Sequence, residues 1–175
     1  SAGTSLFCYK DSIENNSSSI SRSDIKKYPM RGFGDSLHLL QALPGVGGGF
    51  SLATVPIIRG LNPLFNKYYI DDIPVDLPYH FFGAMLPAFS SINEQVIESA
   101  EVIKGNTPLW MNDNLGNAVH IKSAQPEKEG FQFKVMLDPC LPLIPTISAT
   151  YVPRPDLSII ASVRRSNADW IVDYE

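Results

Sequence analysis

Hydrophobic and polar residues alternate in several short stretches, and this pattern predicts many short strands and turns rather than a helical bundle. The alternation is clearest after Gly130, where GFQFKVML is followed by TISATYV and LSIIASVRRS around the turn PRPD, as is typical of hairpin strands. Further strands are expected at VPIIRG and KYYIDDIPV, with a turn at LNP between them. The second half of EQVIESAEVIKG and the segment GNAVHIKS are also expected to be strands.

Two short helices are predicted in the first third of the chain. The first, SDIKKYP, has Ser23 as its N-cap and is stopped by Pro29. The second, DSLHLLQAL, starts at Asp35 and ends at Pro44-Gly45, and its apolar stripe consists of Leu37, Leu40 and Leu43.

Three segments are predicted to lack regular strands. DSIENNSSSIS (residues 11–21) is polar and expected to be flexible, and GVGGGF is expected to be a loop. PYHFFGAMLPAFSSIN is interpreted as an aromatic-rich loop that runs into a turn of helix.

The uncharged run from Ser36 to Ile58 is long enough for a membrane helix, but its prolines and glycines would leave backbone groups unpaired in lipid. This run is therefore not expected to be a transmembrane helix.

Composition narrows the classes of function. With 44% hydrophobic and 18% charged residues the chain can bury a core, and a net charge of −4 with scattered basic residues argues against nucleic acid as the main partner. Cys8 and Cys140 are interpreted as two unrelated thiols, with a single bridge in an oxidising compartment as the alternative. We interpret the opening Ser-Ala-Gly as an expression scar on a mature chain, so the lack of a signal peptide carries no information on export.

The segment KYYIDDIPVDLPYHFFG contains the most suggestive set of polar side chains. Asp71, Asp72, Asp76 and His80 could form a carboxylate–imidazole metal site, but Asp71 and Asp72 are neighbours on a strand and point to opposite faces, so both cannot ligate one ion without a bulge. The alternative is structural: Asp72 ends a strand and tolerates unusual backbone angles. His38 is interpreted as a partly buried packing residue and His120 as a cross-strand neighbour on its short strand. GVGGG lacks the spacing of a phosphate loop. The sequence therefore predicts no catalytic residue, no metal and no cofactor, and the protein is not expected to be an enzyme.

The order of the motifs resembles the plug domain of TonB-dependent outer-membrane receptors. ISRSDIKKYP and GDSLHLLQALPGV precede PIIRGLNPLFNKYYIDDIPV, and INEQVIESAEVIKGN and LGNAVHIKS follow. In that family a helix ending in Pro-Gly-Val precedes an Ile-Arg-Gly strand, a Tyr-x-Asp-Gly-x-Pro hairpin and an Ile-Glu-x-x-Glu-Val-x-(Arg/Lys)-Gly segment. The resemblance implies an α+β fold, with a small mixed β-sheet and short helices followed by β-hairpin strands. Asp72 stands where the family's hairpin glycine is usual.

The resemblance also implies roles for individual residues. A lock between plug and barrel wall would use Arg59, Glu98, Glu101 and Lys104. Loops that contact the ligand would include Gly47, Phe50, Tyr79, His80, Phe81 and Phe82. SLFCYK lies where the Ton box would be, so Leu6, Phe7 and Tyr9 would contact a TonB-like energy-coupling protein.

Domain boundaries follow from the resemblance. Residues 1–18 would be a flexible N-terminal segment, 19–126 the plug, and 127–175 the first barrel strands or an appended sheet. The 45 residues after Gly130 suffice for three or four membrane strands, far fewer than a plugged barrel needs. Two alternatives remain. The chain is either the plug of an outer-membrane transporter for a small molecule or glycan, with its N-terminus facing the periplasm, or a self-standing binding module that pairs with partner chains.

Overall fold

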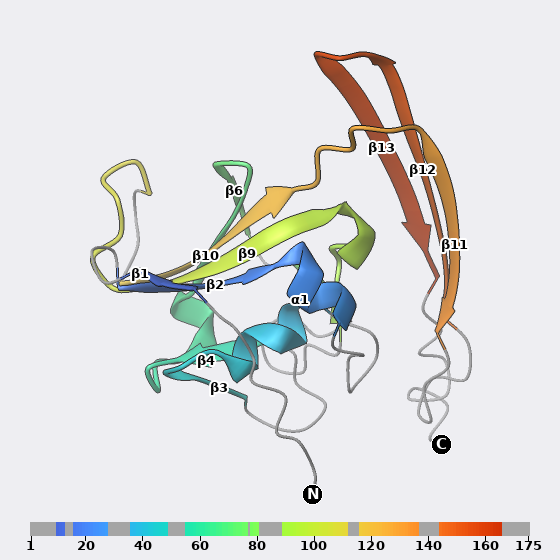
Figure 1. Ribbon diagram of the computed structural model, residues 1–175. Helices are drawn as coiled ribbons and strands as arrows, with labels where there is room; N and C mark the ends of the chain where they lie inside the picture. The colour runs from blue at the N-terminus through green and yellow to red at the C-terminus, as the bar shows by residue number, and fades with distance from the viewer. Residues whose placement is uncertain are drawn as a thin grey trace, which may run out of the picture.

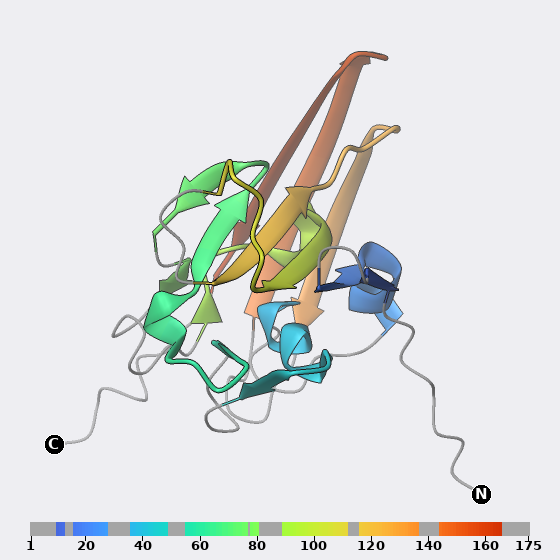
Figure 2. The ribbon, with the colours of Figure 1, turned by 90° about the vertical axis from the view of Figure 1, so that its left-hand side faces the viewer.

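The computed structural model describes residues 10–12, 16–27, 36–48, 55–76, 78–80, 89–111, 116–136 and 144–165. Within these ranges a six-stranded mixed sheet is packed against short helices, and a three-stranded antiparallel sheet stands beside it (Figure 1). The view turned by 90° shows the same two sheets (Figure 2). This arrangement confirms the predicted fold class.

The six-stranded sheet has the order β1-β2-β9-β10-β5-β6. Its strands, in chain order, are β1 (Lys10–Ser12), β2 (Ser17–Ser21), β5 (Lys67–Ile70), β6 (Ile73–Val75), β9 (Ile97–Lys104) and β10 (Asn117–Ser123). Neighbouring strands are antiparallel except β10 and β5, which run parallel with Val119 opposite Tyr68. The central strands β9 and β10 are rich in buried valine and isoleucine, as expected for strands covered on both faces.

The main core lies between this sheet and the 3-10 helix η1 (Ser36–Ala42). Leu37, Leu40 and Leu43 are 0–2% exposed. They recur every three residues, which is the repeat of a 3-10 helix, so all three side chains fall on one side. The predicted apolar stripe is confirmed, although the helix is of the 3-10 type.

The helix α1 (Arg22–Lys27) begins one residue before its predicted cap, Ser23. The backbone N–H of Ser21 donates to Oδ2 of Asp24 at 3.0 Å, and the N–H of Asp24 donates back to Oγ of Ser21 at 3.4 Å. This reciprocal pair makes Ser21 the N-cap, with Asp24 in the place of the usual glutamate. The prediction of Ser23 as the N-cap was wrong because Ser23 already lies inside the helix.

All three segments predicted to lack regular strands contain strands. The aromatic-rich segment includes Tyr79–His80 and Phe89–Ser90, which pair with each other, and the other two are described next. Ser17–Ser21 form β2, which pairs with β9, so this part of the segment predicted to be flexible, residues 11–21, is a strand. The domain boundary predicted after residue 18 falls inside the same strand. Val46–Gly48 form β3, which pairs with β4 (Pro56–Ile58). In both cases the backbone finds a partner far along the chain or across a loop, which local composition does not show.

The β5–β6 hairpin follows the prediction for its turn. Asp71 and Asp72 have φ angles of +47° and +68°, the left-handed region that a tight two-residue hairpin turn requires. Aspartate tolerates this region better than most residues. A short 3-10 helix, η2 (Pro63–Phe65), precedes the hairpin, and Asn62 caps it through a bond from the N–H of Leu64 at 3.0 Å.

The remaining elements lead to the second sheet. β7 (Tyr79–His80) pairs with β8 (Phe89–Ser90), and the 3-10 turn η3 (Glu94–Val96) precedes β9. After β10, the strands β11 (Gly130–Met136), β12 (Ile144–Arg154) and β13 (Leu157–Arg164) form an antiparallel meander, as predicted. None of the helices in the described ranges is long and apolar enough to cross a membrane.

Candidate functional site

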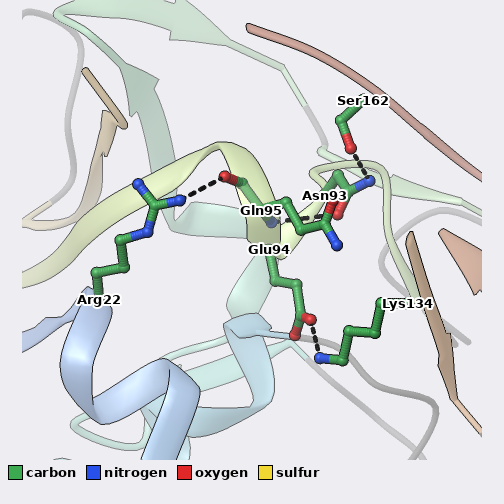
Figure 3. A network of polar contacts seen from close by, with 6 residues as sticks. All are labelled: Arg22, Asn93, Glu94, Gln95, Lys134 and Ser162. Atoms are coloured by element: carbon green, nitrogen blue, oxygen red, sulfur yellow. Dashed lines mark hydrogen bonds and ion pairs between the residues drawn. The ribbon is translucent and has the colours of Figure 1, made fainter. Parts of the chain in front are cut away.

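A network of polar side chains meets at η3, where the two sheets approach each other (Figure 3). Oδ1 of Asn93 accepts a hydrogen bond from the N–H of Gln95 at 3.2 Å and so caps the turn. The amide Nδ2 of Asn93 donates to Oγ of Ser162 on β13 at 2.5 Å. One asparagine therefore fixes the turn and ties it to the second sheet.

Two charged side chains complete this network. Lys134 on β11 forms an ion pair with Glu94 at the start of η3. On the other side Arg22 of α1 donates to the carbonyl oxygen of Gln95 at 3.2 Å (Figure 3). We name this network the η3 junction, and it comprises Arg22, Asn93, Glu94, Gln95, Lys134 and Ser162.

The η3 junction is withdrawn from water on the side of the turn. The side chain of Glu94 is 11% exposed, whereas that of Lys134 is 46% exposed. Oε2 of Glu94 is buried and has no hydrogen-bond partner among the described residues, so this carboxylate depends on Lys134. A third contact lies close by, because the guanidinium of Arg164 on β13 donates to the carbonyl oxygen of Ser90. The second sheet is thus held to the first by several polar contacts at one place.

The faces of the second sheet differ in character. Side chains that point toward the first sheet are polar: Thr146 and Ser148 are buried, and Ser162 and Arg164 make the contacts described above. Side chains on the opposite face are apolar and exposed: Phe131, Phe133, Val135, Ile147, Tyr151, Leu157, Ile159 and Val163. Polar-inside and apolar-outside alternation is the pattern of a transmembrane barrel wall and the inverse of a water-soluble sheet. We name the second group of residues the outer apolar face.

Of the four residues predicted to form the plug–barrel lock, Glu98, Glu101 and Lys104 lie on β9, and Arg59 directly follows β4. Lys104 and Arg59 both lie against Gly45. Lys104 is 6% exposed, and its Nζ donates to Oγ of Ser18 at 2.6 Å and to the carbonyl oxygen of Pro44 at 3.0 Å. Arg59 is exposed, has a φ angle of +52°, and lies with its guanidinium beside Gly105.

The two acidic residues of the predicted lock have other neighbours. Glu98 is exposed and forms an ion pair with Arg22 at 3.3 Å. Glu101 lies opposite His120 of β10 and Ser19 of β2, on the face of β9 opposite to that of Lys104. Exposed pairs such as Arg22–Glu98 contribute little, about 0–1 kcal/mol.

Of the residues predicted to contact a ligand, Gly47 and Tyr79 have a described exposure to solvent. Gly47 is exposed in β3. Tyr79 is 8% exposed, and its ring packs edge-on against Tyr68 with the centroids 5.5 Å apart, so it is a core residue. His80 is placed by its backbone in β7. The other candidate ligand and Ton-box residues, and both cysteines, lie outside the described residues: Leu6, Phe7, Cys8, Tyr9, Phe50, Phe81, Phe82 and Cys140.

His120 is the centre of a small cluster on the second face of the first sheet. Its Nε2 lies 2.9 Å from Oδ1 of Asp72, without the alignment of a hydrogen bond, and its ring is edge-on to Trp110 at 5.6 Å. Asp71 turns elsewhere, since its Oδ1 accepts from the N–H of Ser123 at 2.8 Å. Within the described ranges no three side chains of the metal-binding types gather at one point. His120 is the cross-strand neighbour that the sequence predicted.

A family model described as the TonB-dependent Receptor Plug Domain matches residues 10–118, well over half of the chain. The chain belongs to this family. The resemblance read from the sequence motifs is therefore confirmed, and the family is one of transporters and receptors rather than enzymes.

Solved structures are similar to the plug domain and the strands that follow it. The outer membrane transporter YddB from Escherichia coli is 12% identical with a TM-score of 0.63, and the match covers 87% of this chain and 26% of that one. A double mutant of the Serratia marcescens hemophore receptor HasR, in complex with its hemophore HasA and heme, is 17% identical with a TM-score of 0.60; the match covers 85% of this chain and 23% of that one. The chain thus spans about a quarter of the length of each. No curated protein sequence matches it.

Most of the η3 junction was missed from the sequence. The signal that would have found part of it is the alternation in β11 and β13, where Lys134 and Ser162 are polar residues between outward apolar ones. Arg164, at the end of β13, points inward to Ser90, while the next residue, Arg165, is exposed. The partners in η3 carry no comparable pattern, because they come from a turn of three residues.

Proposed function

We propose that this plug domain gates an outer-membrane transporter or receptor for a scarce nutrient, and that β11–β13 are the first strands of the surrounding barrel. The observation that carries the proposal is the η3 junction, which fastens the plug to strands whose opposite face is apolar and exposed. A gate must be held in the lumen and still be releasable. Polar contacts that water can replace suit this requirement better than a continuous apolar interface.

Several features support a position in the outer membrane. The outer apolar face, with Phe131 at 70% and Val163 at 71% exposed, would cost free energy in water and gain it against lipid. β12 has 11 residues, and a membrane-crossing strand needs about 9–11. In this arrangement the plug fills the lumen, and residues 1–18 face the periplasm, where Leu6, Phe7 and Tyr9 meet a TonB-like energy-coupling protein.

The lock residues keep their proposed roles in the complete barrel. Arg59 is exposed and free to meet a carboxylate of the barrel wall, and the ammonium of Lys104 has a third proton beyond the two used by Ser18 and Pro44. Glu98 and Glu101 are the acidic members of the same region. The loops at residues 45–51 and 76–82 form part of the pocket for a small molecule or glycan, with Gly47 at the exposed end of one of them.

The proposal is tested by permeability of the complete protein in its own outer membrane. Cells are exposed to a large hydrophilic antibiotic that an intact outer membrane excludes. Deletion of residues 19–126 is expected to open the lumen and make the cells sensitive, whereas the unaltered chain keeps them resistant. Unchanged resistance, with the shortened protein present in the outer-membrane fraction by immunoblot, would overturn the gating role.

The lock is tested by point variants in the same assay. Arg59→Ala and Lys104→Ala each remove one cation and are expected to increase antibiotic entry, because a barrel-wall carboxylate would be left unpaired. Lys122→Ala, at an exposed lysine of β10, is the matched control and should leave permeability unchanged. If all three variants behave alike, the lock assignment is wrong even where the gating role holds.

A further inference from the structure

The side chain of Lys104 bonds both the N-terminal strand and the turn before β3. Nζ donates to Oγ of Ser18, in β2, at 2.6 Å. It also donates to the carbonyl oxygen of Pro44, at the end of η1, at 3.0 Å. Both acceptors are neutral, and the lysine is 6% exposed. A buried ammonium of this kind depends strongly on each acceptor that it keeps.

The N-terminal strand is fastened at this same residue by its backbone. Nδ2 of Asn16 donates to the carbonyl oxygen of Lys104 at 2.8 Å, and the N–H of Lys104 donates to the carbonyl oxygen of Asn16 at 3.1 Å. Pairing of β2 with β9 then continues from Ser17 opposite Ile103. Displacement of β2 therefore removes three of the contacts of Lys104 together.

The turn on the other side rests on the same lysine. Gly45 has a φ angle of +73°, and a Cβ atom placed on it would lie 3.7 Å from Cδ of Lys104, so the aliphatic stem lies against the turn. The carbonyl oxygen of Gly45 accepts from the N–H of Arg59 at 2.9 Å, and the N–H of Val46 donates to Leu43 at 3.1 Å. The turn leads directly into β3.

We propose that Lys104 is a positioning residue that couples the docking of β2 to the order of the turn at residues 44–48. When β2 leaves the sheet, the ammonium of Lys104 loses Ser18, the backbone of Lys104 loses its two bonds with Asn16, and water reaches the ammonium. The ammonium then turns toward water and releases Pro44, so the turn loosens. This coupling does not depend on transport. That it carries a signal between the N-terminal segment and the proposed ligand-contacting region rests on the proposed function.

The test is hydrogen–deuterium exchange on the complete protein in detergent, read at the amides of Val46 and Arg59. Ser19→Pro disrupts β2, because Ser19 is the middle residue of the strand and has a partner on each side, Lys10 of β1 and Glu101 of β9. In the otherwise unaltered protein this change is expected to speed exchange at both amides about tenfold or more. This factor corresponds to the loss of one hydrogen bond to a charged group. In a Lys104→Met background, the same change is expected to speed exchange less than twofold further.

Two controls separate coupling from general destabilisation. The amide of Ala124, which donates to Val96 at 2.8 Å on the far side of the sheet, should keep its exchange rate in all variants. Lys122→Met and Arg59→Gln leave the contacts of Lys104 intact, so the tenfold response to Ser19→Pro should persist in both. Arg59→Gln also removes a proposed lock residue, which makes failure of the lock distinguishable from failure of the coupling.

Two results would overturn the inference. One is an unchanged rate at Val46 and Arg59 when β2 is displaced in the unaltered background. The other is an equal response in the Lys104→Met background, which would show that the turn senses β2 by another route. Ser18→Ala supplies a milder perturbation if Ser19→Pro prevents folding, and it is expected to give a smaller change of the same kind that Lys104→Met abolishes.

Discussion

The ion pair at the η3 junction makes an asymmetric prediction about its two partners. In Lys134→Met, the carboxylate of Glu94 stays in a site where its side chain is 11% exposed and Oε2 already lacks a partner among the described residues. Leaving such a group without its cation should cost about 2–3 kcal/mol, somewhat less than the penalty for a fully buried charge. In Glu94→Gln, the ammonium of Lys134 is 46% exposed and recovers water, so the cost should be about 1 kcal/mol or less.

Exchange of the Val96 amide, which donates to Asn93 at 3.1 Å inside the turn, measures this difference in the complete protein. A cost of 2–3 kcal/mol corresponds to exchange about 30–150 times faster, and 1 kcal/mol to about fivefold. The amide of Asp71, bonded to Ile121 at 3.0 Å in the other part of the sheet, serves as an internal reference. Lys128→Met, at an exposed lysine before β11, is the control variant and should change neither rate. Equal acceleration by the two variants, or a larger effect of Glu94→Gln, would refute the reasoning.

Three further predictions concern the core, the outer face and the hairpin. Leu40→Ala, at a side chain that is 0% exposed, should lower the free energy of unfolding of the plug by about 2–5 kcal/mol in urea titration, whereas Leu40→Met should cost less than about 1.5 kcal/mol. Phe133→Lys, on the outer apolar face, should cost about 2–4 kcal/mol of insertion free energy and so reduce the amount of folded protein in the outer-membrane fraction. The neighbouring inward change Gln132→Lys should be tolerated, and equal yields of the two variants on immunoblots would contradict the assignment of the two faces. Asp72→Val should destabilise the hairpin by about 1–2 kcal/mol because φ is +68°, and Asp72→Gly should not, a contrast that thermal unfolding of the two variants can check.

The sequence predicted the elements whose own residues determine them. The strands of the β11–β13 meander, the β5–β6 hairpin and the leucine stripe of η1 each follow from a local period or from turn residues with special backbone angles. The family likewise followed from motifs in order along the chain. These features needed no knowledge of distant partners.

What the sequence did not show depends on contacts between distant segments. β2 is a strand because β9 offers it an edge, and nothing in its serine-rich composition favours that conformation. Lys104 was assigned to the barrel wall from its motif, yet within the described residues its ammonium is held by Ser18 and Pro44. The η3 junction joins residues up to 73 positions apart, as in the contact between Arg22 and Gln95, and a single sequence carries no record of such pairings.

The pairing of β2 with β9 also has a consequence for folding kinetics. Ser17 meets Ile103 and Ser21 meets Ser99, so a strand that emerges early during synthesis waits for a partner made about 80 residues later. Such a large sequence separation delays closure of the sheet. A waiting strand that was rich in valine or isoleucine would be open to association with other chains. Four serines around the single Ile20 give this segment a polar composition that does not favour such association.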